Sequence, residues 1–392
     1  MEGVVSAPAQ GRPEAFSAAF WQGRRVLLTG HTGFKGSWLA LWLAGMGAKV
    51  TGLSLPADEI SLFRQARVGE VVTHIEGDIR DSRAVDAALA AADPEVVFHL
   101  AAQPLVRLSY ETPVETWATN VQGTVHVLDA CRRAGALGVE GLKAIVCITS
   151  DKAYENREWV WPYRESDPMG GHDPYSSSKG AAELAIASFR RSYFGGEGAP
   201  LLASVRAGNV IGGGDWALDR LVPDIIRALI DEQRPFIRNP RAIRPWQHVL
   251  EALGGYLMIA RHLVLGDRWA AEGWNFGPAD EDTRPVDWIA DRLVELWHGE
   301  GVDGRGWDTP TGDLPAPHEA GILKLDCAKA RTLLGWRPAF TLGTALARIV
   351  TWHKHVAATG HDAEGGAARD ISLAQIEDYC RRWDRVSAEK ED

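Results

Sequence analysis

Short apolar runs alternate along the first half of the chain with segments whose apolar residues recur at helical spacing. The runs predict buried strands at 25–29, 49–55, 71–75, 96–100, 144–149 and 201–206. The segments between them predict helices at 37–46, 83–91, 120–134 and 175–193. Because near-continuous apolar strands separated by helices must be covered on both faces, the pattern predicts an α/β fold with a doubly wound, Rossmann-type parallel sheet.

The alternation weakens after about residue 209, where loops rich in Gly, Pro, Trp and Arg separate helices predicted at 223–231, 250–265 and 286–297. The chain after residue 355 is polar and poorly patterned. We therefore expect a main sheet domain and a smaller, discontinuous domain built mainly from the C-terminal part. The predicted boundaries are a disordered tail at 1–21, the sheet domain at 22–205 with a contribution from about 237–275, the smaller domain at 206–236 and 276–375, and a C-terminal tail at 376–392.

Composition narrows the classes of partner. The chain has 392 residues and a formal net charge of −10, which argues against a general nucleic-acid or anionic-membrane surface. Its 4 cysteines lie far apart without metal-ligand spacing, so we expect reduced thiols, a cytoplasmic protein and no metal. The first 20 residues lack the apolar core of a signal peptide, and no run approaches the roughly 20 apolar residues that span a bilayer.

A glycine-rich turn follows the first predicted strand and opens the first long helix. It reads Gly30-His31-Thr32-Gly33-Phe34-Lys35-Gly36. Glycines at these three positions permit a tight turn, close approach of the backbone to a pyrophosphate, and close packing of the helix. The turn therefore predicts a dinucleotide site, and its G-x-x-G-x-x-G spacing resembles that of short-chain dehydrogenases/reductases.

The second strand lacks the acidic residue that usually binds the adenosine ribose. Ser54 lies near that position, while Asp58 and Glu59 come later. The usual distinction between NAD and NADP therefore cannot be made at this strand. After the third strand, Asp78-Ile79 resembles the family's pair that contacts the adenine, although Asp78 also suits a turn or a helix cap.

Tyr175 and Lys179 lie four residues apart at the start of a predicted helix, on one helix face. An ammonium beside a phenol favours the phenolate, which makes Tyr175 a candidate base for a sugar hydroxyl. The strand that ends in Thr149-Ser150 supplies a hydroxyl that can hydrogen-bond the same group. Together these residues predict a Ser-Tyr-Lys catalytic set.

Longer motifs extend this pattern across residues 22 to 355. They are 30–38, 101–110, 149–152, 156–161, 206–216 and 244–248. These motifs resemble those of extended short-chain dehydrogenases that act on nucleotide sugars, and most closely the CDP-glucose 4,6-dehydratases. The resemblance implies catalytic use of NAD, with further cofactor contacts from Leu100, Ala101, Ala102, Gln103 and Asn120 besides Tyr175 and Lys179.

The resemblance also implies a reaction. Such enzymes oxidise C4 of the hexose, eliminate the C6 hydroxyl together with the C5 proton, and return the hydride to C6. Asp151 would then be the acid for the departing hydroxyl. Lys152 stands where relatives acting on dTDP-glucose or GDP-mannose carry Glu, so it would serve either as a neutral-amine base at C5 or as a cation that stabilises the enolate. An ion pair with a neighbouring carboxylate is the structural alternative.

The same resemblance suggests how the substrate diphosphate and sugar are bound. The candidate substrate ligands are Gln103, Arg107, Arg206, Asn209, Arg238, Arg244 and His248. Guanidinium groups match phosphate oxygens in geometry, and Arg206 and Arg244 are the favoured diphosphate ligands. His31 stands where many relatives carry glycine, so we expect its ring to crowd the phosphate-binding turn.

Other functions remain possible at this stage. They are a different nucleotide-sugar 4,6-dehydratase, a nucleotide-sugar 4-epimerase, and a non-catalytic NAD-binding sensor. The Asp151-Lys152 pair argues against the epimerase, and the intact Tyr175/Lys179 pair argues against the sensor. A homo-oligomer, dimer or tetramer, would pair helices such as 121–134 and 181–189.

Overall fold

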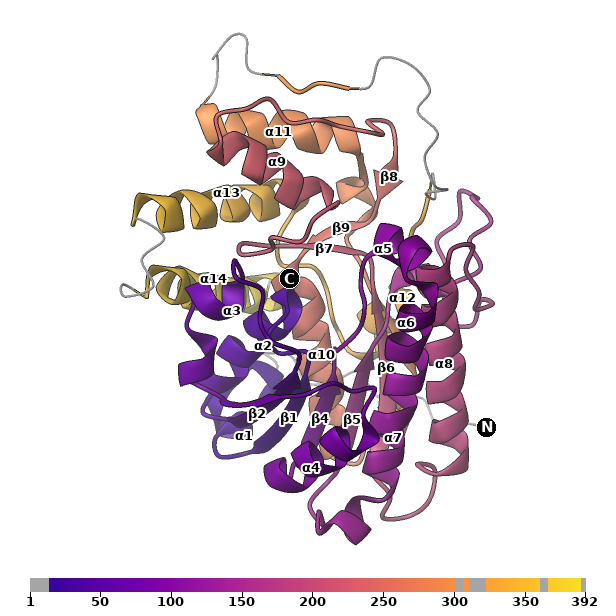
Figure 1. The fold of residues 1–392 in the computed structure, drawn as a ribbon. Coiled ribbons are helices and arrows are strands. Elements are labelled where there is room, and N and C mark those ends of the chain that lie inside the picture. The colour runs from indigo at the N-terminus through magenta and orange to yellow at the C-terminus, as the bar shows by residue number, and fades with distance from the viewer. Residues whose placement is uncertain (1–13, 300–305, 310–321, 360–365, 389–392) are drawn as a thin grey trace.

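The computed structural model describes residues 14–299, 306–309, 322–359 and 366–388. Its main feature is a seven-stranded sheet in the order β10-β6-β5-β4-β1-β2-β3, in which every strand pair is parallel (Figure 1). The strands are β1 (Arg25–Thr29), β2 (Lys49–Ser54), β3 (Thr73–Glu76), β4 (Val96–His99), β5 (Ala144–Ile148), β6 (Leu201–Ala207) and β10 (Gly273–Phe276). The strand order reverses between β1 and β4, which is where doubly wound sheets bind ligands.

Helices cover both faces of the sheet, as the apolar strands require. One face packs against α2 (Phe34–Gly45) and α10 (Val249–Val264), and the other packs against α4 (Ser82–Ala92), α7 (Thr124–Arg132) and α8 (Pro174–Ser192). Successive side chains of β1 alternate between the two cores: Val26 and Leu28 join the first and Leu27 the second. The predicted fold class, a doubly wound parallel α/β sheet, is confirmed.

A smaller group of elements lies beyond the carboxyl ends of the strands (Figure 1). Its strands are β7 (Asn209–Ile211), β8 (Ile243–Arg244), β9 (Trp246–His248) and β11 (Arg284–Pro285), and its helices are α9 (Leu221–Ile230), α11 (Val286–His298) and α13 (Leu342–Ala358). Apolar side chains from α9, α11 and α13 form a third core of their own. The smaller elements α3 (Leu62–Gln65), α5 (Val106–Glu111), α6 (Pro113–Trp117) and α12 (Ala328–Leu333) complete the loops of the fold.

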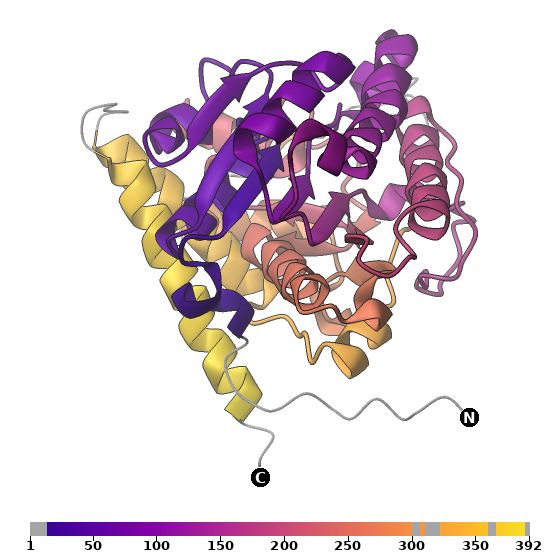
Figure 2. The ribbon, with the colours of Figure 1, turned by 90° about the horizontal axis from the view of Figure 1, so that it is seen from below.

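Two segments that were expected to be tails are ordered. Residues 14–21 form a 3₁₀ turn and α1 (Ala18–Trp21), with Phe16 and Trp21 buried, so the predicted tail is wrong from residue 14 onward. Residues 376–388 belong to α14 (Ala367–Ala388), which runs along the N-terminal helices (Figure 2). Its Tyr379 ring packs against Phe16 and Trp42. Residues 1–13 and 389–392 lie outside the described part of the chain.

The apolar positions of α14 explain why its pattern was missed. Ile376, Tyr379, Cys380 and Trp383 are buried and follow helical spacing, but acidic and basic residues fill the positions between them. Among the described helices, none combines the length and apolar character needed to cross a membrane.

Candidate active site

A cavity of about 700 Å³ lies between the carboxyl ends of the strands and the smaller group of elements. Its wall on the sheet side is formed by the glycine turn after β1, the segments after β2 and β4, and the segment after β5. Its opposite wall comes from residues 207–246, including β7 and the start of α9. The cavity is therefore large enough, and placed at the right edge, for a dinucleotide and a second ligand.

The glycine turn forms a cradle that side chains would fill. Gly30 has φ +77°, and a Cβ there would lie 2.7 Å from the Ala101 nitrogen. A Cβ on Gly36 would overlap the Gly30 carbonyl oxygen. Gly33 caps α2 without a side-chain hydrogen bond, so the positive end of this helix faces the cavity through backbone N–H groups. This is the arrangement that binds a dinucleotide pyrophosphate.

The far end of the cavity has polar groups suited to an adenosine. Thr32 and Ser54 share a hydrogen bond of 2.6 Å at the end of β2, where no carboxylate lies. Asp78 and Ile79 line the cavity as expected. The Asp78 carboxylate also accepts hydrogen bonds from Arg80. Partial burial would raise the pKa of Asp78, but the hydrogen bonds and the charge of Arg80 lower it below its usual range. Asp78 therefore presents an ionised carboxylate.

All five predicted catalytic residues line the same cavity: Ser150, Asp151, Lys152, Tyr175 and Lys179. Ser150 ends the segment after β5 and caps a 3₁₀ turn at Asp151–Ala153 by accepting from the Lys152 backbone N–H at 3.2 Å. Tyr175 and Lys179 lie in the first turns of α8, which packs against this 3₁₀ turn. Ser150 lies close enough to Tyr175 to lower the pKa of its phenol, and both residues line the cavity with Lys179, so the structure brings the predicted Ser-Tyr-Lys set together.

Burial and charge set the protonation of this group. Burial raises the pKa of Tyr175 to about 12, partly offset by the hydrogen bond with Ser150 and the charge of Arg220. Burial lowers the pKa of Lys179 to about 8. Burial, together with the charges of Lys179 and Arg220, lowers the pKa of Lys35 to about 7. Although burial weakens the charge of Lys35 and Lys179, the cavity is also lined by Lys152 and several arginines, so it favours ligands that carry negative charge.

Asp151 has an unused acceptor at the cavity wall. The side chain is 1% exposed, and its Oδ2 has no hydrogen-bond partner in the described structure. Its Oδ1 accepts from the Ser150 hydroxyl at 2.9 Å and lies 3.9 Å from the Lys152 Nζ. Since buried polar atoms are normally paired, the free oxygen points to a ligand group that would bind there.

Four of the predicted ligands do not line the cavity: Arg206, His248, Gln103 and Asn120. Arg206 is wholly engaged by Glu183, Tyr154 and the Glu165 carbonyl, which corrects its assignment as a diphosphate ligand. The buried His248 caps α10 and packs against Trp38 and Phe340.

Gln103 and Asn120 lie behind the lining and fix it in place. Asn120 accepts from the Gln103 backbone N–H at 2.8 Å and donates to Ser178 on α8 at 2.9 Å. The Gln103 side chain donates to Leu105 and Thr116 rather than into the cavity. Asn120 lies in a π-helical turn at Ala118–Gly123, a feature that the predicted uninterrupted helix at 120–134 did not include.

His31 does not crowd the phosphate-binding turn. Its ring lies behind β2, in the space that the missing side chain of Gly52 leaves open, and its Nε2 lies 2.7 Å from the His74 Nδ1. Burial lowers the pKa of His31 to about 4, so the ring is neutral at ordinary pH. The expectation that it reshapes the cofactor site by contact is therefore corrected.

The remaining predicted residues do line the cavity. They are Arg107, Asn209, Arg238, Arg244, Leu100, Ala101 and Ala102. Arg107 and Arg238 come from opposite walls and converge on Asp219, at 3.5 Å and 2.7 Å. Sequence reasoning missed Arg220 and Asp215, which form an ion pair of 3.3 Å in the wall. Asp215 lay within the motif at 206–216, whereas no motif pointed to Arg220.

Comparisons with known proteins agree with this site. A family model described as GDP-mannose 4,6 dehydratase matches residues 27–349. A CDP-glucose 4,6-dehydratase from Salmonella typhimurium is 54% identical over 346 residues, covering 86% of this chain and 92% of that protein.

Solved structures show the same fold. The dTDP-glucose 4,6-dehydratase of Bacillus anthracis in complex with NAD aligns with a TM-score of 0.69 at 18% identity, over 85% of this chain and 97% of that chain. The UDP-glucose 4-epimerase of Thermotoga maritima with UDP-glucose aligns with a TM-score of 0.70 at 22% identity, over 84% and 98%. The fold alone does not separate dehydratase from epimerase, but the family model and the identity over most of the chain do. The chain therefore belongs to the GDP-mannose 4,6-dehydratase family, whose members are nucleotide-sugar dehydratases.

Proposed function

We propose that the chain converts CDP-glucose to CDP-4-keto-6-deoxyglucose and water, with NAD as a cofactor that is regenerated in each turnover. The observation that carries the proposal is the meeting of Tyr175 and Lys179 with Asp151 and Lys152 in one cavity. The first pair supplies the base for oxidation at C4, and the second supplies the groups that elimination across C5 and C6 requires. The choice of CDP-glucose rests on the similarity to the Salmonella relative.

The residues around the glycine turn fit a dinucleotide. The Gly30–Gly36 turn and the start of α2 would hold the pyrophosphate, and Asp78 with Ile79 would hold the adenosine. When bound, NAD would accept a hydride from C4 of the sugar and later return it to C6. The turn and Tyr175 line the same cavity, which allows the sugar and the cofactor to meet there.

Tyr175 would take the proton of the C4 hydroxyl. The Ser150 hydroxyl lies near the phenol and lines the same cavity, so it would share the sugar hydroxyl with Tyr175. The Lys179 ammonium would stabilise the phenolate, because a buried anion requires a nearby cation. Such general base catalysis contributes about 10²–10⁴ in rate.

Elimination needs a proton donor at C6 and a group that handles the C5 proton. The unpartnered Asp151 Oδ2 is the candidate donor, and the departing hydroxyl would leave as water. Lys152 would take the proton from C5, or would stabilise the enolate as a cation. After the hydride reaches C6, a proton returns to C5, so the overall reaction releases only water.

The test is direct. Purified protein is incubated with NAD and with CDP-glucose, dTDP-glucose, GDP-mannose or UDP-glucose, and the products are followed by proton NMR. The proposal predicts a 6-methyl signal with CDP-glucose. A 4-epimer without a methyl signal would favour the epimerase reaction instead. A methyl signal with another sugar nucleotide would change the nucleobase assigned to the substrate.

We also propose that the protein forms a homo-oligomer. Most apolar residues of α7 are buried within the chain, whereas Val114 and Trp117 of α6 and Leu184 of α8 are exposed. Helices α6 and α8 pack against each other, so these side chains lie on neighbouring elements. Light scattering should show a dimer or larger assembly for the parent and a smaller species for Leu184→Glu. A monomeric parent would refute the proposed homo-oligomer.

A further inference from the structure

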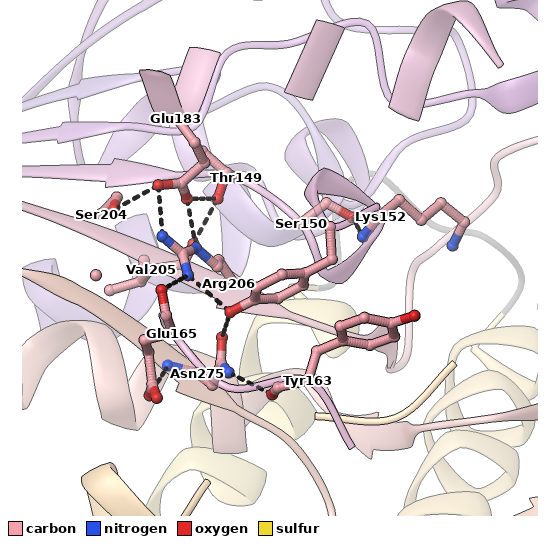
Figure 3. A network of polar contacts seen from close by, with 12 residues as sticks. Thr149, Ser150, Lys152, Tyr163, Glu165, Glu183, Ser204, Val205, Arg206 and Asn275 are labelled. Atoms are coloured by element: carbon pink, nitrogen blue, oxygen red, sulfur yellow. Dashed lines mark hydrogen bonds and ion pairs between the residues drawn. The ribbon is translucent and has the colours of Figure 1, made fainter. Parts of the chain in front are cut away.

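A buried polar cluster lies directly behind the catalytic wall (Figure 3). At its centre, Arg206 of β6 donates two hydrogen bonds of 2.8 Å to the two carboxylate oxygens of Glu183 on α8. Ser204 donates to the same carboxylate at 2.8 Å, and the Thr149 hydroxyl donates to it as well. Glu183 is therefore held by two side chains of β6 and by Thr149, the residue that follows β5.

Glu183 connects both parts of the catalytic set. It lies four residues after Lys179 and eight after Tyr175, so the three side chains follow one face of α8. Its partner Thr149 immediately precedes Ser150. One carboxylate thus links the helix that carries the base to the segment that carries Ser150 and Asp151.

The cluster is tied to the substrate side of the molecule through Arg206. The third guanidinium nitrogen donates to the Tyr154 hydroxyl at 2.7 Å, and Tyr154 donates to Asn275 of β10 at 2.7 Å. The backbone N–H of Asn275 in turn donates to the Glu165 carboxylate at 3.0 Å. The Lys152 side chain points away from this network (Figure 3). The cluster therefore holds the wall without occupying the cavity.

We infer that Glu183 is a positioning residue for the proposed dehydratase reaction: it keeps the Lys179 ammonium charged beside Tyr175 and, through Thr149, holds Ser150 in register with them. This inference rests on the proposed function. It gives Arg206 a role different from diphosphate binding, because Arg206 keeps Glu183 ionised.

The charges around the cluster support this assignment. Burial would raise the pKa of Glu183, but Arg206 and the hydrogen bonds from Thr149 and Ser204 hold it at about 2. Burial lowers the pKa of Lys179, and the charge of Glu183 opposes that effect. Glu183 is thus an anion at every pH at which the enzyme would work.

The other titratable groups near Lys179 and Glu183 do not supply this anion. Those whose charges interact with Lys179 or Glu183 are Lys35, His99, Cys147, Arg190 and Arg206, whereas the carboxylates of Asp151 and Asp173 act on Tyr175. Burial lowers the pKa of His99 to about 3 and raises that of Cys147, so both stay neutral, and the other three groups are basic. Loss of the Glu183 charge should therefore lower the pKa of Lys179.

The pH dependence has a definite sign. At pH values below the pKa of Lys179 the lysine is charged with or without Glu183, so the fraction of active phenolate depends on Tyr175 alone. At higher pH a lysine with a lowered pKa loses its proton earlier, and the active state with phenolate and ammonium becomes rarer. Parent and variant should agree at low pH and diverge as the pH rises.

The experiment uses variants that leave no buried charge unpaired. The double variant Glu183→Gln/Arg206→Met removes the whole ion pair, and Glu183→Asp keeps the charge on a shorter side chain. The matched control is Glu95→Gln/Arg24→Met, which removes an ion pair of 2.7 Å at the amino ends of β1 and β4. The Nζ resonance of Lys179 is titrated by ¹⁵N NMR in lysine-labelled protein, assigned with Lys179→Met among the 9 lysines of the chain. Dehydratase rates are measured over the same pH range.

In the double variant we expect the Lys179 titration to move to lower pH by up to about 1 unit, because the charge of Glu183 acts on Lys179 more strongly than that of Arg206, which is removed with it. The rate should match the parent at low pH and fall about tenfold below it at high pH, with Glu183→Asp restoring much of the difference. The control should melt earlier but titrate like the parent. An unchanged Lys179 titration in a folded double variant would overturn the inference. A parent that makes no keto sugar would refute the proposed function alone, because the NMR titration does not require turnover.

Discussion

Replacing Gly36 by Ala tests whether the glycine turn is built for close approach. Gly36 lies in the first turn of α2, and an added Cβ would overlap the Gly30 carbonyl oxygen and lie 2.7 Å from the His31 Cα. Both neighbours are backbone atoms, so neither can move aside by a change of rotamer. The turn and the helix start must therefore separate.

The magnitude follows from two opposing effects. Overpacking of this kind costs about 1–3 kcal/mol, whereas replacing Gly by Ala inside a helix contributes about 0.5–1 kcal/mol of stability. We expect a net destabilisation of roughly 1–2 kcal/mol. Backbone hydrogen bonds to a charged ligand are worth about 1.5–3 kcal/mol each, so displacing one N–H group should weaken NAD binding by about tenfold or more.

Two other glycines in the same region provide matched controls. A Cβ on Gly33 would lie 3.4 Å from the Gly30 oxygen and otherwise face the cavity, so Gly33→Ala should weaken NAD binding but change stability little. A Cβ on Gly45, the last residue of α2, would make an ordinary contact of 3.7 Å with Leu373, so Gly45→Ala should leave NAD binding unchanged and raise stability by at most about 0.5–1 kcal/mol. Thermal melting and calorimetric titration with NAD measure both quantities. A Gly36→Ala protein that melts and binds like the parent would show that the turn is not closely packed against a dinucleotide.

Three further predictions concern the catalytic groups and the pH dependence of stability. Tyr175→Phe should lower the dehydratase rate by about 10²–10⁴ while the melting temperature changes little, since the buried ring stays and only its hydroxyl is removed; a parent-like rate would rule out Tyr175 as the base. Lys152→Met should block exchange of the C5 proton with D₂O while reduced dinucleotide still forms in a single turnover, and full exchange would remove Lys152 from the elimination. Burial raises the pKa of Glu251 from 4.5 to about 8. Between these pH values the unfolded chain releases a proton that the folded protein retains, so the free energy of unfolding falls as the pH rises. Glu251→Gln should remove that decline, which is about 1 kcal/mol per pH unit. The amide oxygen can still accept from the Ala339 and Phe340 N–H groups, so the variant should fold. Parallel stability curves for the two proteins from pH 5 to about 8 would contradict this.

The sheet and its glycine turn could be predicted because their signals are local. A buried parallel strand needs a continuous apolar run, and β1, β4 and β5 have one, so their predicted positions agree with the structure to within one residue. The helix α14 was missed because half of its surface is exposed and charged, and its apolar positions have meaning only against Phe16 and Trp42, which are distant in sequence.

The grouping of the candidate catalytic residues in one cavity was predictable for a similar reason, whereas the partner of Arg206 was not. Ser150, Tyr175 and Lys179 lie in short motifs whose spacing already places them together. An arginine in a motif can bind a phosphate or neutralise a buried carboxylate, and the sequence around Arg206 suits both. The choice depends on Glu183, which lies 23 residues away on another element. A guanidinium that satisfies both oxygens of a buried carboxylate cannot leave it for a diphosphate without stranding that charge, at a cost of about 3–5 kcal/mol. We therefore expect the substrate to rely on the arginines that line the cavity, and Arg206 to act on the site through Glu183 and Tyr154.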